Sequence, residues 1–199
     1  MSQAKDRFII LKAIKYSEAD LILHALSPHG EKLSFIARGA LRSKKRFGGG
    51  VLEPTHFVSF TYKRSSEEGQ LNVLQEASLI NDFAALRKDY DRLELALHFL
   101  ECVSRVSQEG DQNSEFLFNL LGNALKAAES AEDHLVLKMH FYLKFLLQQG
   151  VVQAEPWMTP FLRANLSETN NLLSYRPLVD DELTNVEAMV KHYLQHATL

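Results

Sequence analysis

The sequence predicts an α+β protein in which a barrel of five strands, over residues 1–80, precedes an all-helical domain over residues 81–199. Short apolar runs separated by turn residues fill the first part, as in small antiparallel barrels. After Asn81 the apolar residues recur with a helical period instead. The charge also changes sign, because residues 1–64 hold 12 lysines and arginines against 5 acids, whereas residues 65–199 hold 10 against 20. The positive half is therefore expected to meet a polyanion.

The expected strands are short and end at turn residues. We place them at residues 7–16, 20–26, 31–37, 55–62 and 70–80. The sequence Ser27-Pro28-His29-Gly30 is a strong turn signal after the second run. In the third run, Leu33, Phe35 and Ala37 share one face, and Lys32, Ser34 and Ile36 share the other. Five such strands with basic faces and loops favour an OB-fold, which is a five-stranded Greek-key barrel.

The second part of the chain is expected to form four main helices. They begin at Asn81 or Asp82, at Asn113 or Ser114, within Ser130–Asp133, and at Asp180; the first runs to about Ser107 and the third ends at Gly150. The polar stretch 165–177 is expected to be a loop. The apolar cluster at 157–162 is either packing that closes the bundle or a peptide-binding groove.

Composition excludes several classes of protein. No apolar run approaches the roughly 20 residues that span a bilayer, and the first residues lack the features of a signal peptide, so no membrane contact and a cytoplasmic location are expected. The single cysteine, Cys102, permits neither an intramolecular disulfide nor a cysteine-rich zinc module. No Walker A, zinc-protease or nucleophile-elbow motif occurs. The sequence therefore predicts a protein that is not an enzyme and has no metal site or cofactor.

The strongest local feature is the stretch 38–50, which carries five bases and no acid between the third and fourth strands. Its bases are Arg38, Arg42, Lys44, Lys45 and Arg46. The phosphates of a single strand lie along an irregular path, and a basic loop can place positive charges along such a path. Phe47 offers a ring that could stack on a base, and the glycines at 48–50 let the backbone bend close to a ligand. The alternative is a solvated basic loop with no ligand.

Strand residues extend the predicted positive surface. These bases are Lys12, Lys15, Lys32, Lys63 and Arg64, each of which alone could be an ordinary surface residue. Four rings, Tyr16, Phe35, Phe57 and Tyr62, are either stacking platforms or part of the barrel core.

Several motifs in the first half resemble those of one bacterial family. They are Glu18-Ala19-Asp20 before the second strand, His29-Gly30 in the next turn, Ala37-Arg38-Gly39-Ala40, the loop Ser43–Gly49, and Leu52-Glu53-Pro54. Together they resemble the N-terminal region of the RecO family of recombination mediators. The resemblance covers residues 7 to about 105 well and continues more weakly to Gly150.

The resemblance implies an OB-fold followed by a helical domain, and a protein that binds and anneals single-stranded DNA. It also implies partners, namely RecR-like proteins, the single-strand-binding protein SSB, and RecA, whose loading the family assists. Arg38, Arg42, Lys44, Lys45 and Arg46 would contact DNA, with double-stranded DNA left open as a further ligand. This chain resembles a short member, and because no cysteine follows Cys102 it lacks the four-cysteine zinc site of many members. Two alternatives remain: an RNA-binding OB protein, and a protein–protein adaptor that has lost DNA binding.

Overall fold

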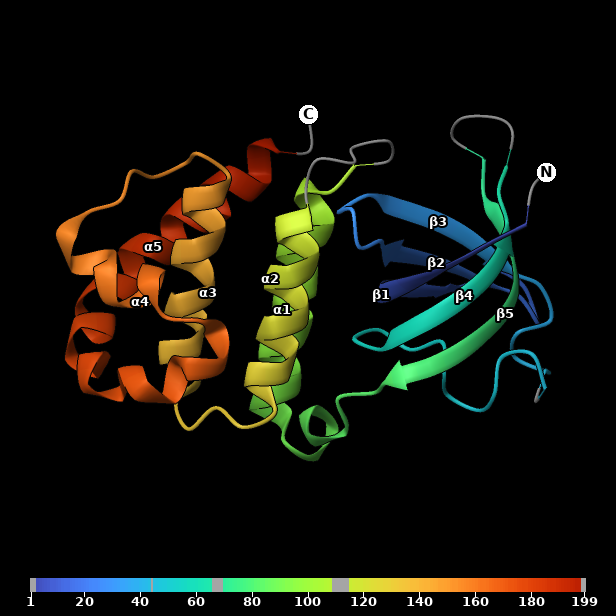
Figure 1. Ribbon diagram of the computed structural model, residues 1–199, viewed down its shortest axis with the longest axis horizontal. Helices are drawn as coiled ribbons and strands as arrows, with labels where there is room; N and C mark the ends of the chain where they lie inside the picture. Colours follow the sequence, from blue (N-terminus) through green and yellow to red (C-terminus); the bar gives the residue numbers. More distant parts are fainter. Residues whose placement is uncertain (1–2, 44, 66–69, 109–114, 198–199) are drawn as a thin grey trace. The chain divides into compact units, whose positions relative to one another are not determined.

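The computed structural model describes residues 3–43, 45–65, 70–108 and 115–197 (Figure 1). It is an α+β structure, with five strands followed by helices, as the sequence predicts. The chain divides into two compact units. The first comprises the described residues of 1–83 and 107–118, and the second comprises 84–106 and 119–197.

The strands of the first unit form a closed barrel with the OB-fold order β1-β2-β3-β5-β4. They are β1 (Gln3–Lys15), β2 (Leu21–Leu26), β3 (Lys32–Ala37), β4 (Phe57–Lys63) and β5 (Asn72–Asn81). Four of the five pairings are antiparallel, and β3 with β5 is the parallel pair that closes the barrel. The long first strand serves two neighbours, because its first half pairs with β4 and its second half with β2.

Large rings fill the barrel. Phe8, Phe35 and Phe60 are fully buried, with ring centroids 5.1 to 5.3 Å apart. Tyr62 adds edge-to-face contacts to Phe8 and Phe35. Such aromatic contacts contribute beyond their buried area, so this cluster stabilises the barrel, and of the four rings considered as stacking platforms, Phe35 and Tyr62 belong to the core.

A β-bulge changes which face of β5 turns inward. Thr61 pairs with Glu76, but the next residue, Tyr62, pairs with Leu74, so Gln75 is the extra residue. Leu74 and Ala77 are therefore both buried, although strict alternation would place them on opposite faces.

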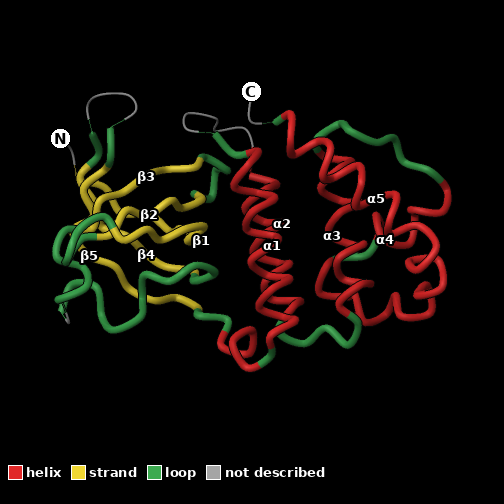
Figure 2. Tube along the Cα trace, turned by 180° about the vertical axis from the view of Figure 1, so that it is seen from behind, coloured by secondary structure: helices red, strands yellow, loops and turns green. Residues whose placement is uncertain are grey.

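The second unit is helical throughout its regular structure. Its elements are η1 (Ala84–Lys88), α1 (Tyr90–Val106), α2 (Glu115–Ala128, whose first four residues belong to the first unit), α3 (His134–Gln148), η2 (Pro156–Met158), α4 (Thr159–Arg163), η3 (Leu166–Tyr175) and α5 (Arg176–His196). In Figure 2, α3 and α5 run side by side, and they pack against each other.

Three expectations for this unit are wrong, and one of them is the start of the last helix, which begins at Arg176 rather than at Asp180. The first long helix begins at Tyr90 rather than at residue 81, because Phe83 has a positive φ of 47° and a 3₁₀ turn intervenes. The stretch 165–177 is not a loop, since Leu166–Tyr175 is 3₁₀-helical. The polar composition of this stretch gave no sign that three of its side chains are buried, namely those of Leu166, Thr169 and Leu172.

The apolar cluster at 157–162 packs within its unit, since Met158 and Phe161 are 3% and 0% exposed. The ring of Phe161 lies 6.0 Å from the buried ring of His140 on α3. Of the two readings of this cluster, the geometry favours packing over a peptide groove. Among the described residues, no helix is both long and apolar enough to cross a membrane.

Candidate nucleic-acid interface

The basic loop after β3 is anchored to the turn between β1 and β2. The backbone N–H of Gly39 donates to Asp20 Oδ1 at 2.7 Å, and that of Leu41 donates to the carbonyl of Ala19 at 2.9 Å. Gly39 has a φ of 69°, which favours glycine and lets the chain turn sharply out of the sheet. These contacts bring together Glu18-Ala19-Asp20 and Arg38-Gly39, two motifs far apart in the sequence.

Arg46 connects the middle of the loop to the start of the loop and to β5 by hydrogen bonds. Its guanidinium Nη2 donates to the carbonyl of Arg38 at 2.9 Å and its Cζ lies 5.0 Å from the centre of the Phe47 ring. Its carbonyl accepts from the N–H of Ala77 on β5 at 3.0 Å. Arg46 thus has a structural role as well as an exposed positive charge.

Phe47 is not the exposed stacking ring that the sequence suggested. Its side chain is 2% exposed and belongs to the barrel core cluster with Phe8, Phe35 and Phe60. The ring of Phe47 packs into the apolar core, although it belongs to the loop, so the ring is not exposed to a base on the surface. Of the candidate platforms, Tyr16 stays largely exposed, at 64%, whereas Phe57 is half-buried and its ring lies 5.9 Å from that of Phe118.

The other loop bases lie on the surface. Arg38 and Lys45 are exposed. Arg42 pairs with Glu18 at 3.2 Å, but both side chains are largely exposed, at 71% and 91%, so this pair contributes little and a phosphate can compete for the arginine. Lys44 lies outside the described residues.

Two of the strand bases flank a histidine on the outer face of the barrel. Lys12 pairs with His24 across β1 and β2, and His24 pairs with Ser34 across β2 and β3, with 2.9 Å between His24 Nδ1 and Ser34 Oγ. Burial lowers the pKa of His24, and the charges of Lys32 and Lys12 lower it further. Burial also lowers the pKa of Lys32. Lys12 and Lys32 therefore both add positive charge to this face of the barrel.

The remaining strand bases sit at strand ends. Lys15 is the exposed last residue of β1, and Lys63 that of β4. Arg64 follows β4, and its Nη2 lies 3.9 Å from Oε1 of Glu31, whose side chain is only 9% exposed. The positive charge of Arg64 is therefore partly compensated.

A row of aliphatic side chains, which the sequence analysis missed, lies beside Lys12 and His24 on the same outer face of the barrel. The register aligns Ile14, Ile22, Ile36 and Val73 across β1, β2, β3 and β5. All four are partly or largely exposed. The available signal was that Ile22 and Ile36 alternate with the buried Leu23 and Phe35, and so must point outward.

Comparison with known proteins identifies the family to which this barrel belongs. Residues 1–83 match the family model described as "Recombination protein O N terminal". The "DNA repair protein RecO" of Syntrophus aciditrophicus is 35% identical over 150 residues, which are 75% of this chain and 57% of that protein. The chain belongs to the RecO family.

Other RecO proteins show a similar degree of relatedness. The "DNA repair protein RecO" of Desulfosudis oleivorans is 31% identical over 72% of this chain and 55% of its own length. That of Rubrobacter xylanophilus is 32% identical over 75% of this chain and 58% of its own. The chain therefore spans little more than half the length of the curated RecO relatives it matches. Its barrel and its anchored loop fall within the matched RecO region.

Proposed function

We propose that this chain binds single-stranded DNA in recombinational repair, through the basic loop and the outer face of β1, β2 and β3. The observation that carries the proposal is the loop itself. Exposed Arg38 and Lys45 are carried on a segment that Asp20, Ala19 and Ala77 tie to the barrel. A cationic surface on a fixed scaffold binds phosphates without first having to order itself.

The proposed mechanism is electrostatic and needs no chemistry on the DNA. Cations of the loop and of Lys12, Lys15 and Lys32 neutralise phosphates and release their counterions. Bases turned toward the sheet would lie on the aliphatic row of Ile14, Ile22, Ile36 and Val73. Two strands held on one positive surface repel each other less, which would promote annealing without ATP.

The partners are proposed from the relatives. Because the relatives are named DNA repair proteins, we propose that this chain assists RecA loading together with RecR-like and SSB-like proteins, at the bacterial nucleoid. The two alternatives predict different ligands, RNA for an RNA-binding barrel and protein alone for an adaptor.

Fluorescence anisotropy with a mixed-sequence single strand of about 30 nucleotides, long enough for an OB-fold site, tests the proposal. We expect binding that weakens steeply with salt. The variant Arg38→Glu/Lys45→Glu should bind more weakly, and neutral replacements at both positions should lower the log–log salt slope by about 1.4, since each contact with a single-strand phosphate contributes about 0.7.

The matched control is Lys126→Glu/Arg163→Glu, which reverses two exposed cations of the helical unit. It should bind almost as the unmodified chain does. Equal losses in the two double variants would show that total charge, and not the loop, governs binding. Preference for a matched RNA would favour the RNA-binding alternative, and no binding of either nucleic acid at low salt would leave the adaptor.

A further inference from the structure

Beside the basic loop, the first unit contains a hollow of about 440 Å³. Its apolar lining comes from the start of β2 and from the loop, with Leu21, Ala40, Leu41, Phe47 and Leu52. The backbone of Gly48–Gly50 supplies another part of the wall. This volume falls in the range of about 300–1,000 Å³ that is usual for sites of small organic ligands.

The hollow is formed before any ligand arrives, since the contacts that hold the loop also hold its walls. The N–H of Leu41 is bonded to Ala19, and the carbonyl of Arg46 accepts from Ala77. The side chain of Leu41 is nevertheless 50% exposed beside the hollow. An apolar side chain held in that position gives a flat apolar ligand a surface to cover.

The charges around the hollow select against a phosphate inside it. Among the described residues that line it, Arg42 and Glu53 carry opposite charges. Glu53 would repel a phosphate, whereas its carboxylate is compatible with a neutral ring that carries N–H groups. The exposed cations Arg38 and Lys45 belong to the same loop but do not line the hollow.

We propose that this hollow receives one unstacked nucleobase of the single strand whose phosphates lie on the neighbouring loop cations. The inference rests on the proposed function and adds a base-binding subsite to it. Apolar walls would cover the faces of the base, while Ser43 and the glycine peptide groups of the lining would face its polar edge.

Gly49 lies in the wall of the hollow and is a position where a side chain can be added. A Cβ built there meets nothing within 4 Å, and the residue does not have a positive φ, unlike Gly48 and Gly50. A side chain at position 49 is therefore tolerated by the backbone. We expect Gly49→Ala to behave as the unmodified chain and Gly49→Leu to obstruct the base.

The test compares two single strands of about 12 nucleotides, within the site size of an OB-fold, one with bases and one abasic, so that both carry the same phosphates. Gly49→Leu and Leu41→Ala should weaken binding of the base-bearing strand about five- to a hundredfold, the range measured when one stacked base loses its platform. Both should leave binding of the abasic strand unchanged. The matched control is Leu97→Ala, which shortens an equally exposed leucine on α1 (44%).

The other results separate failure of the subsite from failure of the proposed function. Equal binding of the two strands by the unmodified chain shows that no base is recognised, while the phosphate interface stands. If Gly49→Leu weakens binding of both strands equally, the substitution has disturbed the loop itself. The subsite then stands or falls with Leu41→Ala, whose thermal unfolding should equal that of the unmodified chain. Failure of the unmodified chain to bind either strand refutes the proposed function instead.

Discussion

Arg46 shows how one side chain can serve both structure and binding. Its guanidinium bonds to the Arg38 carbonyl and lies over Phe47, so removing it loosens the loop as well as deleting a charge. Lys45, its exposed neighbour, is the cleaner probe of phosphate binding. The sequence predicts the charge of both residues equally well, but the difference between them depends on contacts with residues that the loop reaches only when folded.

His140 is a second residue whose surroundings decide its behaviour. It is fully buried on α3, with Nδ1 2.9 Å from Thr169 Oγ1 and Nε2 3.2 Å from the carbonyl of Ala164. Burial lowers its pKa to about 4, and the charge of Lys144 acts in the same direction. The imidazole is therefore neutral near pH 7, and the carbonyl of Ala164, which can only accept, favours the tautomer with the proton on Nε2. Nδ1 faces the Thr169 hydroxyl, which itself donates to the carbonyl of Leu166 at 2.7 Å.

We expect His140 to make the protein less stable in mild acid. The unfolded chain takes up the proton near pH 6.5 and the folded one only near pH 4, so the free energy of unfolding should fall by roughly 3 kcal/mol as the pH drops through that window. Denaturant unfolding at several pH values measures it, and His140→Gln, which keeps a polar group but does not titrate there, should remove most of this loss. An unchanged pH profile in that variant would assign the acid sensitivity to other groups.

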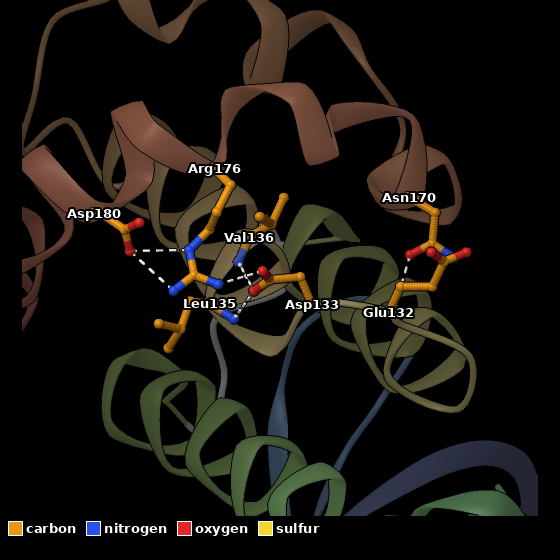
Figure 3. A network of polar contacts seen from close by, with 7 residues as sticks. All are labelled: Glu132, Asp133, Leu135, Val136, Asn170, Arg176 and Asp180. Carbon is orange, nitrogen blue, oxygen red and sulfur yellow. Dashed lines mark hydrogen bonds and ion pairs between the residues drawn. The ribbon is translucent and has the colours of Figure 1, made fainter.

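At the scale of elements, the start of α3 is fixed by one carboxylate. Asp133 caps the helix, accepting from the N–H groups of Leu135 at 2.9 Å and Val136 at 3.1 Å, and it also accepts from Arg176 at the start of α5 (Figure 3). Arg176 is shared with Asp180 on the next turn of α5. Burial alone would raise the pKa of Asp133, but the bonds from Arg176 and the two backbone N–H groups outweigh it and lower the pKa.

We expect Asp133→Ala to lower the free energy of unfolding by about 1–2 kcal/mol, the usual cost of losing a helix cap. Asp133→Asn should lose less, since an amide oxygen still caps the helix but no longer pairs with Arg176. The stabilisation is present above pH 4 and is lost as the pH falls through the lowered pKa of Asp133. Thermal unfolding measures these effects. The exposed neighbour Glu132→Gln serves as control, and a loss there equal to that of Asp133→Ala would point to net charge instead of the cap.

Most elements could be predicted from sequence, because burial follows a regular period in them. The alternation of Leu33, Phe35 and Ala37 and the turn at 27–30 are confirmed by the burial of those side chains and by the strand ends. The start of α1 and the helical stretch 166–175 were not predicted, since both depend on what the segment packs against. For the same reason the loop charges could be read from the sequence, whereas the hollow and the burial of Phe47 could not.

At the scale of the whole molecule, the net charge of -3 describes neither unit. The excess of bases lies in residues 1–64 and the excess of acids in the rest. Attraction to a polyanion at physiological ionic strength is set within about one Debye length, roughly 8 Å, so it depends on the local surface and not on the sum.

The affinity for single-stranded DNA should therefore change less than about threefold between about pH 6.5 and pH 8, although the whole protein becomes more negative as the pH rises. Ammonium and guanidinium groups ordinarily titrate well above this range. Titrations at constant ionic strength check it. A tenfold or greater weakening at the higher pH would show that net charge, or a titrating histidine at the interface, controls binding.

The parallel pairing that closes the barrel has a consequence for where the barrel opens. Only Phe35 with Asn72 and Ile36 with Val73 join β3 to β5, and the amide of Asn72 supports the seam by donating to the carbonyl of Ser34, 38 positions away. If this seam parts, every antiparallel ladder survives and an open sheet of order β3-β2-β1-β4-β5 remains. Each antiparallel ladder of the barrel has six or seven register pairs, so this seam has the fewest pairs to break. The barrel therefore has a natural first step in local opening, at these two register pairs.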